Sequence, residues 1–183
     1  MKNKIHELEF KLDSNIINID EVNKINEWIN SNSKINLKLL YRLRRDGKNP
    51  SDFHNKCDNQ SPTLVVIKTK DGSKIGGYTT STWNEEGEKD KYDNDSFLFS
   101  LSGLKKYPKI ENNQSIIADK NWGPAFGGGA DLGVGCNRDL FSGWSNTGDN
   151  TFIKNRELTQ GKSKFFVEEL EVFKINKINN NDL

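Results

Sequence analysis

The chain has 183 residues, with 27 Lys and Arg against 26 Asp and Glu, which gives a formal net charge of +1. This balance excludes a polybasic nucleic-acid-binding protein and an acidic tail protein. Aromatic residues make up 10% of the chain, which argues against global disorder, and the length predicts one domain with a short extension.

The two cysteines, Cys57 and Cys136, are too few for a secreted disulfide scaffold, so we expect reduced thiols and a cytoplasmic location. No apolar run approaches the length of about 20 residues that a membrane span requires. The first residues also lack an apolar signal region. We therefore expect no stable insertion into a membrane.

Helical patterns come first in the chain. Apolar residues recur at helical spacing within 1–15, which we expect to be an N-terminal extension. Asp20 is the expected cap of a helix over 21–30, and Pro50 fits the first position of a later short helix. The intervening segment 37–42 is compatible with a strand or a helix.

After this helical part, the pattern changes to that of strands. A hairpin turn at Asp71-Gly72 is expected to join two of them. Early helices followed by strands predict an α+β fold with antiparallel sheets, in a domain over 16–176 with a frayed tail at 177–183. The strands are expected at 63–69, 74–79, 97–101, 115–118 and 165–175.

The sequence carries no motif for a metal or a phosphate group. His6, His54 and the two cysteines do not have the spacing of a structural zinc site. The glycine-rich stretch 123–135 matches neither the dinucleotide fingerprint nor a P-loop, and we interpret it as a tight turn. We expect no metal and no cofactor.

His54 and Cys57 could form a Cys–His dyad, because residues three apart lie near each other on a helix. However, Phe53 and Cys57 lie four apart and would share the buried face of that helix, where a thiol is inert. Cys136 follows the glycine-rich stretch and lacks an obvious base.

Glu171 is the most informative acid. It shares a strand face with Phe173 and Ile175, so a covered sheet would bury its carboxylate, which must then be paired or hydrogen-bonded. The structural interpretation pairs Glu171 with Arg42, Arg44 or the amides of the glycine turn. The catalytic interpretation makes it an acid–base group, with Asp131 as the second carboxylate.

A small basic cluster, Arg42, Arg44 and Arg45, precedes Asp46 and fits either a salt-bridged turn or a partner-docking patch. Phe97 and Phe99 could imitate an RNA-stacking platform, but a core strand explains them better. We expect no nucleic-acid partner.

Several short blocks follow one another in a fixed order from about residue 17 to residue 175. They are Leu39-Leu40-Tyr41-Arg42 with Arg45-Asp46-Gly47, Asp52-Phe53-His54 with Cys57-Asp58, Pro62-Thr63-Leu64 with Ile67-Lys68, Gly76-Gly77-Tyr78-Thr79 with Trp83, Phe97-Leu98-Phe99-Ser100-Leu101, Gly123-Pro124 with Phe126-Gly127-Gly128-Gly129 and Asp131-Leu132, and Leu170-Glu171-Val172-Phe173. In content and order these blocks resemble the TLDc domain family of oxidation-resistance and nuclear receptor coactivator-like proteins.

The resemblance implies two antiparallel β-sheets packed as a sandwich with flanking helices. It also implies protection against oxidative stress and binding to the soluble sector of the vacuolar proton pump, with no established catalytic mechanism. The expected structural or interaction positions are Arg42, Arg45, Asp46, Gly76, Gly77, Gly123, Phe126, Gly127, Gly128, Asp131 and Glu171.

The resulting hypothesis is a non-enzymatic protein-interaction domain. One alternative is a thiol-based redox enzyme or scavenger that uses Cys57 or Cys136. A second alternative is an acid–base hydrolase built around Glu171 and Asp131, which would require a water-accessible cleft holding both carboxylates.

Overall fold

The computed structural model describes residues 11–29, 32–84, 90–110, 112–146, 151–153 and 157–178. The helical spacing expected near the N-terminus lies mostly outside these ranges, as do residues 179–183 of the expected tail. The elements are α1 (Ile19–Ile29), β1 (Lys34–Arg42), α2 (Leu43–Asp46), α3 (Pro50–Cys57), β2 (Thr63–Thr69), β3 (Lys74–Thr79), β4 (Asp90–Lys91), β5 (Phe97–Ser100), β6 (Lys105–Pro108), β7 (Ile116–Ile117), β8 (Ala125–Phe126), β9 (Leu132–Val134), β10 (Ser142–Trp144) and β11 (Lys164–Ile178).

All strand pairs between the described residues are antiparallel. They form an 11-stranded sheet in the order β4-β7-β8-β9-β10-β11-β2-β3-β5-β6, and β1, outside this order, pairs with the later residues of β11. The α+β class with antiparallel strands is therefore confirmed. The two separate sheets of the expected sandwich are not confirmed, because the long strand β11 joins the strands into one sheet.

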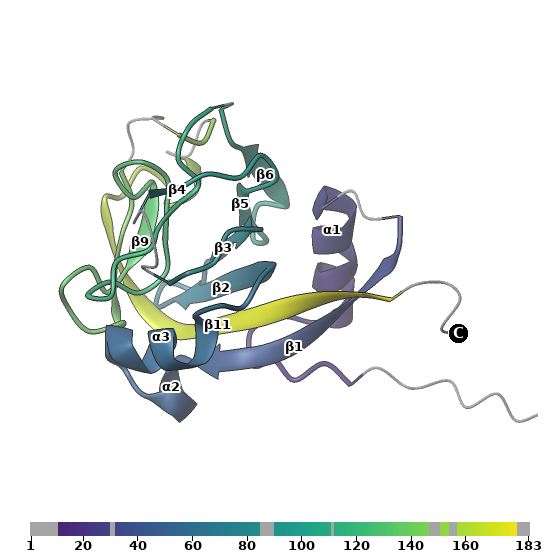
Figure 1. The fold of residues 1–183 in the computed structure, drawn as a ribbon, viewed down its shortest axis with the longest axis horizontal. Helices are drawn as coiled ribbons and strands as arrows, with labels where there is room; N and C mark the ends of the chain where they lie inside the picture. Colours follow the sequence, from purple (N-terminus) through teal and green to yellow (C-terminus); the bar gives the residue numbers. More distant parts are fainter. Residues whose placement is uncertain are drawn as a thin grey trace, which may run out of the picture.

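The sheet folds over so that its two halves enclose a core (Figure 1). Strand β8 faces β3 although they are far apart in the strand order: a Cβ added at Gly77 of β3 would lie 2.6 Å from the ring of Phe126 in β8. One side of β11, including Leu170 and Val172, packs into this enclosed core. The sharp fold of the sheet follows from such close contacts, which only glycine allows.

The opposite side of β11 packs against helix α1. Phe173 and Ile175 contact a second apolar cluster that includes Val22 and Ile25 of the helix. The alternation of side chains along β11 therefore supplies both clusters from one strand. This explains why residues 169–173 of β11 are all buried, whichever side of the strand they face.

Local signals set the bounds of the helices. Asn18, and not the expected Asp20, caps α1: its side chain accepts from the Glu21 N–H (2.9 Å) while the Glu21 carboxylate accepts from the Asn18 N–H (3.0 Å). The expectation of Asp20 as the cap is wrong, because a reciprocal pair that starts two residues earlier satisfies the helix terminus. Helix α3 begins at Pro50 as expected, with Asn49 and Asp52 as its capping box.

The strands expected at 63–69 and 74–79 match β2 and β3 at both ends. The ambiguous segment is a strand, β1. Residues 177 and 178, expected in a frayed tail, belong to β11, where Lys177 pairs with Ile35 of β1. No helix in the described part of the chain has the length and apolar character needed to span a bilayer.

Candidate functional site

Glu171 is fully buried and is held by donors from two distant parts of the chain. Its carboxylate accepts hydrogen bonds from Ser14 Oγ (2.5 Å), from the Asn15 N–H (2.9 Å) and from Arg42 Nε (2.7 Å). Arg42 Nη2 also donates to Asp13 Oδ1 at 2.8 Å. The expected burial is confirmed, and of the partners left open by the sequence Arg42 is the one that binds. The cluster fixes residues 13–15 against the sheet.

The other arginines have separate partners. Arg45 donates to both oxygens of Asp46 at 2.9 and 2.8 Å, and this fork-like pairing lowers the pKa of the Asp46 carboxyl. Arg44 does not reach Glu171; its Nε donates to the carbonyl oxygen of Glu168 at 2.9 Å. The basic cluster thus forms contacts within the fold.

Asp131 is also fully buried and organises the glycine turn. Its Oδ2 accepts from the N–H groups of Thr151 (3.0 Å) and Phe152 (2.9 Å). Gly127 has φ +85°, and a Cβ there would lie 2.9 Å from Asp131 Cγ; the Gly128 N–H donates to Thr151 Oγ1 at 2.9 Å. The carboxylate therefore binds one turn of the chain to another.

Glu171 is held by Ser14, Asn15 and Arg42, whereas Asp131 is held by the backbone of residues 151 and 152, and both residues are fully buried. The expected acid–base pair is therefore not assembled. Among the described residues, no three His, Cys, Asp or Glu side chains are grouped to hold a metal ion.

The glycines at 76 and 123 also stand where side chains would collide with their neighbours. A Cβ at Gly76 would meet the carbonyl oxygen of Val65, and a Cβ at Gly123 would meet the side chain of Leu140. Together with the contact of Gly77 and Phe126, these positions have a packing role.

The Cys–His dyad does not form. His54 Nδ1 contacts Asp58 Oδ1 at 2.7 Å, and its Nε2 contacts the carbonyl oxygens of Asp119 (3.1 Å) and Trp122 (3.0 Å). Both ring nitrogens thus face oxygens rather than Cys57, which is fully buried, and burial strongly raises the pKa of that thiol. Burial also raises the pKa of Cys136 to about 12, so its neutral thiol form dominates near neutral pH.

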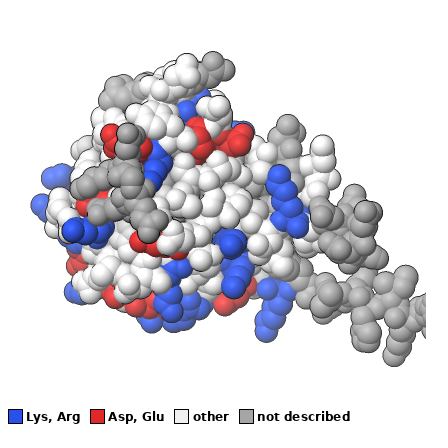
Figure 2. Space-filling model, in the orientation of Figure 1, with Lys and Arg blue, Asp and Glu red and all other residues white. Residues whose placement is uncertain are grey.

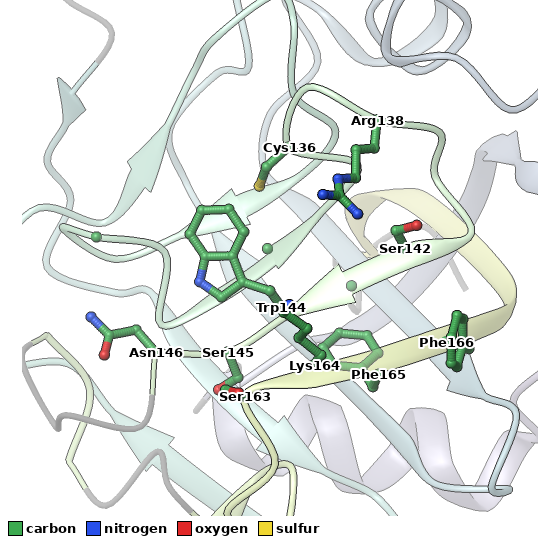
Figure 3. A pocket seen from close by; sticks show the side chains of 13 residues that line it. Cys136, Arg138, Ser142, Trp144, Ser145, Asn146, Ser163, Lys164, Phe165 and Phe166 are labelled. Atoms are coloured by element: carbon green, nitrogen blue, oxygen red, sulfur yellow. The ribbon is translucent and has the colours of Figure 1, made fainter.

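Among the described residues, one feature that could receive a ligand is a pocket of about 760 Å³ on the outer side of β9, β10 and the first residues of β11. We call it the outer pocket. Its side chains include Cys136, Arg138, Ser142, Trp144, Lys164 and Phe166 (Figure 3).

The pocket arises from strand register. Trp144 of β10 pairs with Gly133 of β9 on one side and with Lys164 of β11 on the other. Gly133 has no side chain, and the place that a Cβ would take is closed by Cys136 Sγ at 3.2 Å and by the Cβ atoms of Ala130 and Ala125 at 3.3 and 3.8 Å. Gly133 and Cys136 both line the pocket beside Trp144. The Trp144 ring is itself supported by Trp122, with ring centroids 5.5 Å apart in an edge-to-face arrangement.

Sequence reasoning missed Trp144, Arg138, Lys164 and Phe166. Strands β9 and β10 have three residues each, which is too short for a visible alternation. Two short segments could have indicated the site. In Ser-Gly-Trp at 142–144 two side chains on one face flank a glycine, and Lys-Phe-Phe follows later at 164–166.

Three curated proteins are similar to part of the chain. Human nuclear receptor coactivator 7 is 30% identical over 141 residues, which cover 74% of this chain and 14% of that protein. TBC1 domain family member 24 of Xenopus tropicalis is 28% identical over 119 residues, which cover 62% of this chain and 20% of that protein. GTPase-activating protein skywalker of Drosophila melanogaster is 31% identical over 94 residues, which cover 46% of this chain and 15% of that protein.

The chain therefore spans a fifth or less of the length of these relatives. The family model described as the TLDc domain matches residues 10–176, which is nearly all of the chain and includes the Glu171 cluster, the glycine turn and the outer pocket. The chain belongs to the TLDc domain family.

Proposed function

We propose that the chain is a non-enzymatic protein-interaction domain. The observation that carries this proposal is the state of the catalytic candidates: Glu171 and Asp131 are buried and hydrogen-bonded, and both nitrogens of His54 face oxygens. A general acid or base must reach the proton that it transfers, and a nucleophile must be exposed to its substrate. These groups instead stabilise the fold, which leaves the surface for recognition.

The thiol-based alternative is less well supported. The reactive form of cysteine is the thiolate, and burial raises the pKa of both Cys57 and Cys136. A redox-sensing cysteine normally has a lowered pKa and an exposed sulfur. Any protection against oxidants would then come from a protein partner.

For the partner, we propose the soluble sector of the vacuolar proton pump, with oxidative-stress protection as the cellular outcome and the cytoplasm as the location. Membership of the TLDc family supports this choice. On the face drawn in Figure 2, basic and acidic side chains of the described residues are interspersed, which favours a protein over nucleic acid as the partner.

The binding test uses the purified chain immobilised on a resin and the purified soluble sector at micromolar concentration. We expect the sector to be retained by the chain and released by the same chain added in solution. An immobilised chain that has been unfolded irreversibly is the control. Retention equal to that control would overturn the pump proposal.

The cellular test separates binding from thiol chemistry. The Cys57→Ala, Cys136→Ser double variant is expected to protect cells from peroxide as well as the unchanged chain does, at equal protein level. Loss of protection by a double variant that still folds and still binds its partner would instead favour the thiol-based alternative.

A further inference from the structure

We propose that the outer pocket binds an extended acidic segment of a partner protein, with carboxylates on Arg138 and Lys164 and an apolar side chain against Trp144. This inference rests on the proposed function as an interaction domain. It adds the site and the chemistry of the segment that the site would recognise.

The charge of the pocket is the first argument. Arg138 and Lys164 both line it, and among the described residues that line it none is Asp or Glu. Within the described part of the chain, neither cation forms a side-chain hydrogen bond or salt bridge, whereas Lys162, close to Lys164 along the chain, pairs with Asp71 at 3.0 Å. The two unpaired cations therefore favour a ligand with more than one negative group.

The aromatic side chains are the second argument. Trp144 is half-exposed and lines the pocket, and Phe166, which also lines it, has 67% of its surface exposed. Figure 3 shows Trp144 and Phe166 on the same side of the strands, with Arg138 reaching toward the space between them. Trp and Arg are enriched among the residues that dominate binding energy at protein interfaces, and an aromatic ring beside cations is complementary to an apolar side chain beside acids.

The spacing of the site argues for an extended segment. Two cross-strand pairs, Trp144 with Lys164 and Ser142 with Phe166, lie side by side on this face. Their spacing is that of alternate residues, about 6.5–7 Å, which is also the repeat of side chains on one face of an extended peptide. A small anion would occupy one such pair and leave the other bare.

The segment must bind through its side chains rather than as an added strand. Strand β10 is paired with β9 on one edge and with β11 on the other, so its backbone groups are already used in the ladder. Specificity would then come from the order of acidic and apolar residues in the partner.

The test uses a displayed library of random peptides on the immobilised full chain, with prior depletion on an Arg138→Ser, Lys164→Ser double variant. We expect enrichment of peptides in which Asp or Glu flank Trp, Phe or Leu. Binding of synthetic copies of these peptides is then measured by fluorescence anisotropy. They should bind the unchanged chain, and their affinity should be about tenfold or more lower for the double variant and for Trp144→Ala. Lys38→Ser, an exposed lysine of β1, is the matched control and should bind normally.

The inference would be overturned if neutral or basic peptides were enriched. It would also be overturned if the unchanged chain enriched no peptide more strongly than the double variant does. Displacement of the acidic peptides by phosphate or citrate at equal concentration would overturn it as well, since this would indicate a small-anion site. Trp144→Ala could weaken binding by unfolding, so thermal unfolding is measured on each variant and only folded variants are compared.

The outcomes also separate this inference from the pump proposal. If the soluble sector binds the unchanged chain and the double variant equally, and no acidic peptide is enriched, the pocket inference fails and the pump proposal stands. If acidic peptides bind and the sector does not, the pump proposal fails and the pocket inference stands.

Discussion

At the scale of single residues, Glu171 shows how a buried charge can hold a chain segment in place. Its donors are Ser14 and Asn15, which precede helix α1, and Arg42, at the end of β1. Glu171→Ala would leave the guanidinium of Arg42 without its buried partner. We expect a loss of about 3–5 kcal/mol in the free energy of unfolding, measured by urea denaturation followed by circular dichroism.

Glu168→Gln is the control, because it lies on the same strand and pairs with Lys68 in a half-exposed position, where the Glu168 side chain keeps 41% of its surface. An exposed pair of this kind is worth about 0.2–1 kcal/mol. Equal losses for the two variants would mean that the Glu171 cluster does not stabilise the fold.

The paired glycines of β3 give a second prediction. An Ala side chain at Gly77 would press into the ring of Phe126, and one at Gly76 would meet the carbonyl oxygen of Val65. We expect each substitution to cost about 1–3 kcal/mol by overpacking, and Gly76→Ala to cost more because backbone cannot move aside as a ring can. Thermal unfolding of both variants measures the difference.

Gly103→Ala is the comparison for these variants, since its nearest neighbour would be the hydroxyl oxygen of Ser100 at 3.3 Å. It should change stability by only a few tenths of a kcal/mol. A Gly77→Ala variant as stable as Gly103→Ala would contradict the close approach of β3 and β8.

At the scale of elements, helix α1 tests which residue is its cap. Asn18 and Glu21 exchange hydrogen bonds across the first turn, whereas Asp20 lies inside the helix. Asn18→Ala should cost about 1 kcal/mol, and Asp20→Ala only a few tenths through the helix dipole. Chemical denaturation measures the free energy of unfolding of both variants. A larger loss of stability for Asp20→Ala than for Asn18→Ala would mean that Asp20 is the cap, as expected from the sequence.

Elements with strong local patterns could be predicted from the sequence. The uniform apolar run of β2 and the Pro50 start of α3 are such patterns, and their bounds agree with the structure. The alternation at the end of β11 also placed Glu171 on the face of Phe173. These features depend on neighbours in sequence, which is why the sequence was sufficient for them.

The outer pocket could not be predicted in the same way. It depends on register between three strands that come from separate parts of the chain, with Gly133, Trp144 and Lys164 in one row. The choice of Arg42 over Arg44 as the partner of Glu171 also depends on register, since Arg42 is the residue of β1 that pairs with Glu171. Local patterns do not specify such pairings.

At the scale of the whole molecule, one strand closes the core. The first residues of β11 pair with β10 and its later ones with β2 and β1, so both halves of the sheet depend on it. Cys57 lies fully buried in the core between these halves, in the cluster that contains residues of β11. A thiol reagent should therefore reach Cys57 only when the whole domain opens.

We expect iodoacetamide to label Cys57 with the same dependence on urea as global unfolding. Glu171→Ala should accelerate this labelling about tenfold for each 1.4 kcal/mol lost from the free energy of unfolding. Cys136 lies at the edge of the outer pocket and should react in the folded state, slowly at pH 8 because burial raises its pKa to about 12. Since the thiolate is the reacting form, the rate should rise about tenfold for each unit by which the pH is increased toward that value. Mass spectrometry of the peptides that carry each cysteine measures both rates. Labelling of Cys57 at zero urea as fast as that of Cys136 would mean that the core opens locally and that β11 does not hold the two halves together.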